Sequence, residues 1–170
     1  MLELGCGTGK LTARLLAGRL PEDARYLGLD VSPRMVGLAS ARVAPWSDRA
    51  EVRLVDGSLP LPAGDGAHDR FLALWVLDLM DDAATAAILD EAVRVLAPGG
   101  LLCLAGLTYG RGGLARVVSA GWEALWRLRP VLVGGCRPRT ISLPDAFAVR
   151  HRRVVVSWGV ASEVVVAARL

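Results

Sequence analysis

The first sixteen residues, MLELGCGTGKLTARLL, constrain the fold more than any other stretch of the chain. A short apolar run, Met1–Leu4, leads into glycines at alternate positions, Gly5, Gly7 and Gly9, and then into the helix-like segment Thr8–Leu20. Glycine permits a sharp turn and lets a ligand approach the backbone, and the following helix start offers free N–H groups. The stretch therefore predicts a strand, a ligand-binding turn and a helix.

Three nucleotide-binding patterns could account for this turn. The phosphate-binding P-loop needs Ser or Thr after its lysine, but Lys10 is followed by Leu11. The dinucleotide fingerprint GxGxxG needs a third glycine where Lys10 stands, so NAD(P) binding is kept only as an alternative. The pattern ExGxGxG, with an acid at the end of the next strand, is satisfied by Glu3, the three glycines and Asp30.

Short apolar runs alternate with helical stretches along the first two thirds of the chain. Strands are expected at 1–4, 25–30, 51–58, 69–80 and 101–109, and helices at 8–20, 32–43, 82–97 and 111–130, with Thr8 and Ser32 as N-caps. Such alternation indicates parallel βαβ units, and residues 152–158 and 161–170 read as a terminal antiparallel hairpin. We expect an α/β fold with a doubly wound, mostly parallel sheet and a short first strand.

Length and composition indicate one globular domain over residues 1–170, with 111–150 as a variable basic segment. No uninterrupted apolar run is long enough for a membrane span, and the first residues lack the features of a secretory signal. The three cysteines, Cys6, Cys103 and Cys136, form neither a metal-binding pattern nor a disulfide framework. We therefore expect reduced thiols, a cytoplasmic protein and no metal site.

Positive charge is concentrated late in the chain. Residues 111–153 contain nine arginines and two acids, whereas the residues before them carry more acids than bases. This distribution indicates either an anionic partner at that segment or a solvated basic face.

Four segments in order resemble the class I S-adenosylmethionine (SAM)-dependent methyltransferases. They are LELGCGTGKLTARLL, YLGLDVSPRMVGLASAR, RLVDGSLPLPAGDGAHD and VLAPGGLLCLAGLTYG, and together they lie within residues 1–110. The final hairpin also resembles the last two strands of that family, whereas 111–150 matches loosely. The resemblance implies a seven-stranded sheet of order 3-2-1-4-5-7-6 with an antiparallel last strand, SAM as cofactor and S-adenosylhomocysteine as its product.

The resemblance also implies a set of cofactor-binding residues. Gly5, Gly7 and Gly9 would pass under the methionine and ribose, Glu3 would orient the loop or meet the cofactor's ammonium, and Asp30 would accept the ribose hydroxyls. Asp56 would accept the adenine amino group, and Met35 would pack on the ring. The full set is Glu3, Gly5, Cys6, Gly7, Gly9, Asp30, Val31, Met35, Asp56, Gly57, Ser58, Trp75 and Val76.

No catalytic base stands out from the sequence. Methyl transfer needs alignment and exclusion of water, and it needs a base only when the acceptor must lose a proton. Candidates at the predicted strand tips are Asp78, Asp81 and Tyr109.

The basic segment 111–130 has two interpretations. It packs on the sheet as a crossover helix and lid over the substrate, or it contacts an anionic membrane surface or a lipid-like substrate, because it is basic, amphipathic and contains Trp122 and Trp126. We expect no nucleic-acid partner, because no RNA-binding motif accompanies the arginines.

The resembling family usually has a helix before its first strand, and here that region is missing. We therefore expect a truncated chain or one with a minimal front end, with a second copy or a partner chain covering the site. The expected function is methyl transfer to a small-molecule or lipid-like acceptor. The alternatives are a SAM-binding protein without catalysis and an NAD(P)-dependent oxidoreductase.

Overall fold

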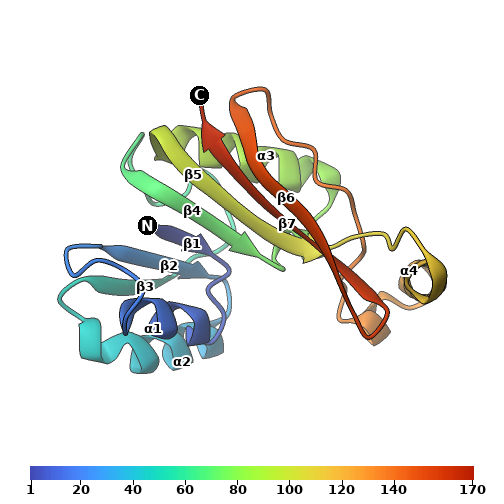
Figure 1. The fold of residues 1–170 in the computed structure, drawn as a ribbon. Helices are drawn as coiled ribbons and strands as arrows, with labels where there is room; N and C mark the ends of the chain where they lie inside the picture. Colours follow the sequence, from blue (N-terminus) through green and yellow to red (C-terminus); the bar gives the residue numbers. More distant parts are fainter.

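The computed structural model describes residues 1–170 and contains one seven-stranded sheet (Figure 1). Its strands lie in the order β3-β2-β1-β4-β5-β7-β6, and β7 alone runs in the direction opposite to that of the other strands. This order, the antiparallel last strand and the short first strand confirm the predicted fold. The strands are β1 (Leu2–Leu4), β2 (Tyr26–Asp30), β3 (Ala50–Leu54), β4 (His68–Leu74), β5 (Leu96–Leu107), β6 (Phe147–Ser157) and β7 (Val160–Arg169).

Helices cover both faces of the sheet. The α-helices are α1 (Lys10–Leu16), α2 (Pro33–Val43), α3 (Asp82–Val95) and α4 (Gly113–Leu128), with short 3-10 turns η1 (Ala44–Trp46), η2 (Leu77–Leu79) and η3 (Pro130–Val133). Helices α1 and α2 lie on one face and α3 on the other (Figure 1). Two hydrophobic clusters follow from this layering, a larger one that includes residues of α3 and a smaller one that includes residues of α1 and α2.

The residues at the N-termini of α1 and α2 explain where these helices begin. Ser32 caps α2, because its Oγ accepts a hydrogen bond from the Met35 amide at 3.4 Å, and Pro33 occupies the first helical position as expected. Helix α1 instead follows Gly9, which has a φ of 68° and offers no side-chain cap. The prediction that Thr8 caps this helix was therefore wrong, and α1 is shorter than the expected segment 8–20.

Two strands also end earlier than predicted. Strand β4 stops at Leu74 rather than residue 80, because Trp75 takes a left-handed conformation with φ of 55° and η2 follows. Strand β3 stops at Leu54, where a turn containing Gly57 begins. Strand β6 starts at Phe147, within the stretch expected to be irregular, because it pairs with β7 along nearly its whole length.

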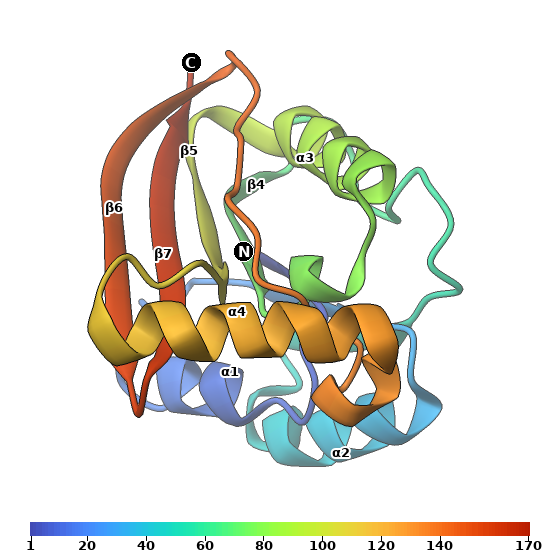
Figure 2. The ribbon, with the colours of Figure 1, turned by 90° about the vertical axis from the view of Figure 1, so that its right-hand side faces the viewer.

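Helix α4 lies apart from the two layers, on the side of the sheet where β5 ends (Figure 2). Only Ala115 and Ser119 of this helix are fully buried. None of the helices is both long and apolar enough to cross a membrane.

Candidate functional site

The glycine turn after β1 is shaped by contacts on two sides. The amides of Gly5 and Cys6 donate to the Leu29 carbonyl at 2.8 and 3.1 Å, which holds the turn against β2. A Cβ on Gly5 would lie 2.8 Å from Val76 Cγ2, and one on Gly9 would lie 3.0 Å from the Ala39 Cα. These two glycines are therefore needed for close packing within the protein.

Gly7 differs from its two neighbours. It also has a positive φ, 55°, but a Cβ built on it would meet nothing within 4 Å. The open side of the turn is thus at Gly7, where a ligand can come into contact with the backbone.

Asp30 lies at the carboxyl end of β2 and faces this turn. Its Oδ2 accepts a hydrogen bond from the Gly7 amide at 2.8 Å, and its Oδ1 accepts one from the Ser32 amide at 2.9 Å. A carboxylate has about four acceptor positions, so two amides leave room for two hydroxyl donors. The carboxylate therefore both fixes the turn and remains able to accept hydrogen bonds from a sugar.

Glu3 lies on the face of the sheet covered by α1, because Leu2 and Leu4 point to the other side. Its Oε2 accepts hydrogen bonds from the Thr12 hydroxyl at 2.5 Å and the Tyr26 hydroxyl at 2.8 Å. Burial raises the pKa of Glu3, and the two hydroxyl donors partly oppose that rise. Of the two roles expected for Glu3, this geometry favours orienting the glycine turn, from the side of the sheet that α1 covers.

A hollow beside Val31, the residue that follows Asp30, contains several of the predicted cofactor residues but none of the glycine turn. Its volume is about 650 Å³, and its walls include Val31, Asp56 and Ser58. Asp56 is fully exposed and accepts hydrogen bonds from the amide and the hydroxyl of Ser58, which lowers its pKa. A Cβ on Gly57 would lie 3.7 Å from Val31 Cγ1, so the two loops meet here.

The remaining predicted residues surround the turn with apolar surface. Val76 packs against Gly5, and Trp75 and Val31 are each more than half exposed. Met35 lies half-buried in the first turn of α2, where its amide meets the Ser32 cap. Exposed apolar side chains beside an open turn are well placed to contact a ligand.

Cys6 is buried within the turn. Burial raises the pKa of its thiol to about 12, and the nearby charges of Asp30 and Glu3 act in the same direction. Because the thiolate is the nucleophilic form, Cys6 is a packing residue here.

The three candidate bases have different surroundings. Asp78 is 1% exposed, its Oδ2 accepts from the Leu107 amide at 2.9 Å, and its Oδ1 has no partner. Burial raises the pKa of Asp78 to about 6. Asp81 caps α3 by accepting from the Ala84 amide at 2.7 Å, whereas Tyr109 is partly exposed. A role as base stays a prediction for all three.

The structure buries one arginine of the basic segment, for which the sequence indicated only an anionic partner or a solvated face. Arg139 is 8% exposed, donates to the Leu77 carbonyl at 3.0 Å, and also contacts Thr85 and Asp82. With Tyr109 it lines a hollow of about 440 Å³ between α3 and the segment 137–142. No local pattern marks Arg139, because it lies in a turn-rich stretch whose partners are more than 50 residues away in sequence.

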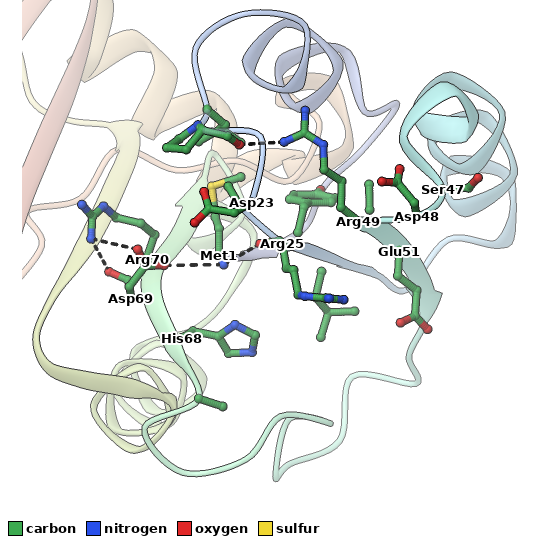
Figure 3. Close-up of a pocket in the computed structure, with 17 residues that line it drawn as sticks. Met1, Asp23, Arg25, Ser47, Asp48, Arg49, Glu51, His68, Asp69 and Arg70 are labelled. Atoms are coloured by element: carbon green, nitrogen blue, oxygen red, sulfur yellow. Dashed lines mark hydrogen bonds and ion pairs between the residues drawn. The ribbon is translucent and has the colours of Figure 1, made fainter.

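A hollow of about 800 Å³ lies at the opposite ends of the strands, around their amino ends (Figure 3). Charged residues from the amino ends of the strands line it, including Arg25, Arg49 and Asp69, together with His68. None of the predicted cofactor residues is among those lining it. Ligands of open parallel sheets bind at the carboxyl ends of the strands, so this hollow is separate from the candidate site.

Comparisons with known proteins agree with the geometry. Residues 1–100 match the family model described as a methyltransferase domain. The chain is 40% identical over 103 residues to trans-aconitate 2-methyltransferase of Methylobacterium radiotolerans, covering 61% of this chain and 36% of that protein. It is 30% identical over 135 residues to the O-methyltransferase rstn1 of Aspergillus nomiae, covering 79% and 58% respectively. The chain thus spans between about a third and three fifths of these relatives.

The fold is also similar to that of a solved SAM-dependent methyltransferase from Methanosarcina mazei. The TM-score is 0.68 at 19% identity, and the match covers 99% of this chain and 91% of that one. At this identity the likeness supports the fold alone.

The residues around the turn fit the cofactor of this family. Gly7 leaves an open face on the turn, and Asp30 keeps acceptor positions free beside it. The hollow that contains Asp56 begins at Val31, the residue after Asp30. Since the family model covers more than half of the chain, the chain belongs to the methyltransferase domain family of class I enzymes, and its cofactor is S-adenosylmethionine.

Proposed function

We propose that this protein transfers a methyl group from S-adenosylmethionine to a small-molecule or lipid-like acceptor. The single observation that carries the proposal is the open face of Gly7 directly beside the Asp30 carboxylate. The names of the two relatives, one a trans-aconitate methyltransferase and one an O-methyltransferase, support a small-molecule acceptor.

In this proposal each residue has a defined task. Asp30 accepts the two ribose hydroxyls while it keeps the Gly7 amide in place, and Asp56 accepts the adenine amino group. Glu3 orients the turn from the α1 side of the sheet, where the Thr12 and Tyr26 hydroxyls donate hydrogen bonds to it. The bound cofactor supplies an electrophilic methyl group. Apolar surface at the mouth of the site, including Trp75, excludes water from the reacting atoms.

The acceptor is expected on the side of Tyr109 and the hollow that contains Arg137 and Arg139. Both arginines contact the same carboxylate, Asp82, so their charge is partly compensated. This hollow therefore suits a polar or weakly anionic acceptor better than a highly charged one.

Calorimetry with SAM and with NADH, on the wild-type protein and on Asp30→Ala, tests the cofactor. We expect SAM to bind the wild type, SAM binding to fall at least about tenfold in the variant, and NADH not to bind. Binding of NADH without SAM would instead support the oxidoreductase alternative.

Incubation with isotope-labelled SAM and a metabolite extract then tests catalysis. Labelled methyl groups found by mass spectrometry on a metabolite support the proposal and identify the acceptor. SAM binding without any labelled product supports the alternative of a binding protein that lacks catalysis.

A further inference from the structure

Helix α4 carries a stripe of apolar side chains that face solvent. Leu114 and Val117 are each 69% exposed, and Leu128, near the end of the helix, is 79% exposed. With Gly121 and Leu125 between them, these positions recur every three or four residues and so lie on one side of the helix. We call this row the α4 stripe.

The stripe is distinct from the side of α4 that packs on the protein. Trp122 and Trp126 face inward, because their indole N–H groups donate to the carbonyls of Cys136 and Gly135 at 2.9 and 3.0 Å. The tryptophans that suggested membrane contact from the sequence are therefore used to hold the loop after the helix. The exposed stripe is what remains available to a partner.

Further exposed apolar residues lie at both ends of the stripe. The tip of the β6–β7 hairpin lies near the first turn of α4 (Figure 2), where a Cβ on Gly159 would approach Val118 and Leu114 within 3.4 Å. Trp158, next to Gly159, is 97% exposed. At the other end, Val131 in η3 is also almost fully exposed.

Arginines border this apolar surface. Arg116 and Arg127 are exposed on α4, and Arg111 and Arg129 stand at its two ends. Glu123, the sole acid of the helix, is already paired with Arg127 at 2.6 Å. Two copies of the chain meeting through this surface would bring like charges together, whereas an anionic surface would complement them.

We propose that the α4 stripe and Trp158 dock the protein onto an anionic lipid bilayer. An apolar row flanked by arginines is the arrangement of a helix lying in a membrane interface, and tryptophan favours the same depth. Helix α4 lies on the side of the sheet where β5 ends (Figure 2), so docking through α4 would bring the carboxyl ends of the parallel strands toward the bilayer. The docking itself does not depend on methyl transfer.

Flotation with vesicles of phosphatidylcholine, with and without phosphatidylglycerol, tests this docking. We expect binding only to vesicles that contain phosphatidylglycerol, weakened by high salt. Binding should be accompanied by a blue shift of tryptophan fluorescence that is lost in Trp158→Phe. Equal binding to both kinds of vesicle, or none to either, would overturn the proposal.

Two sets of variants separate the apolar and the charged contributions. The double variant Val117→Gln, Leu128→Gln, which leaves the charge unchanged, should lower binding about tenfold or more, whereas Leu38→Gln, on the exposed side of α2, should not. Full binding by the double variant contradicts the role of the stripe. Wild-type self-association that the double variant abolishes would show that a second copy covers this face.

The arginine variants remain decisive if the glutamines disturb folding, which circular dichroism reports. Replacing Arg116 and Arg127 by alanine should lower binding to anionic vesicles about thirtyfold. The matched control replaces Arg14 and Arg19, two exposed arginines in and after α1, and should bind like the wild type. Equal losses in both pairs would show general charge attraction and contradict a specific docking surface.

Discussion

Replacement of Gly7 by alanine tests the proposed contact of the turn with the cofactor separately from the packing of the turn. A methyl group at Gly7 meets no protein atom within 4 Å, whereas one at Gly5 lies 2.8 Å from Val76 Cγ2. Both residues have a positive φ, 55° and 68°, so both variants share the same kind of backbone strain. They differ in what the added methyl group contacts, which is open space at Gly7 and protein at Gly5.

The expected losses in stability follow from this difference. A left-handed conformation costs alanine about 1–2 kcal/mol, and the smaller freedom of the unfolded chain returns part of that cost. Gly7→Ala should therefore lower the free energy of unfolding by about 1 kcal/mol. Gly5→Ala adds overpacking and should lose about 3 kcal/mol, or roughly 9 °C in Tm for a chain of this size.

The loss of SAM affinity should be larger for Gly7→Ala than for Gly5→Ala, the reverse of the order for stability. In Gly7→Ala the methyl group occupies space that the cofactor needs, so calorimetry should show an affinity at least about tenfold weaker in a protein that is still folded. Thermal unfolding of the same samples supplies the stability scale. Wild-type SAM affinity in Gly7→Ala would refute the assignment of the open face of the turn to the cofactor.

Three other perturbations probe the site and its surroundings. Asp30→Ala removes the acceptor of the Gly7 amide and should cost about 1–3 kcal/mol of stability in urea unfolding, besides weakening SAM binding; unchanged stability would show that this hydrogen bond is not needed. Burial raises the pKa of Asp78 from its usual 3.8 to about 6, so its ionisation opposes folding. Unfolding measured against pH should show wild-type stability falling by about 3 kcal/mol more than that of Asp78→Asn as pH rises from 3 to above 7, and parallel curves would contradict this. Trp122→Phe removes the bond to the Cys136 carbonyl and should cost about 1 kcal/mol; limited proteolysis should cleave the loop after α4 faster, with SAM affinity unchanged.

Much of the site could be predicted because its determinants are local in sequence. Glycines at alternate positions need a turn with positive φ, and an acid at the end of the next parallel strand lies beside that turn. The Gly7 amide and Asp30 Oδ2 come within 2.8 Å of each other in this way. Ser32 and Pro33 likewise start α2 through contacts within one helical turn.

Contacts between distant segments could not be predicted in this way. From the sequence, Glu3 can either orient the turn or meet the cofactor's ammonium. The hydrogen bonds that Thr12 and Tyr26 donate to it favour the first role, and they depend on how α1 and β2 pack against β1. The burial of Arg139 could not be predicted, because it depends on contacts with η2 and α3, which are distant in sequence. The helical periodicity of α4 was evident, but not which of its sides would face the protein.

The sequence by itself determined the succession of strands and helices along the chain, the glycine turn and the acid that faces it, since each depends on residue type and short spacing. The tertiary structure alone decided that Trp122 and Trp126 turn inward, that Trp158 projects into solvent, and that Asp78 is buried with an unpaired oxygen. The physical reason is that the exposure of a side chain is a property of all the elements around it. Its own segment limits the directions it can take, and packing with distant segments selects among them.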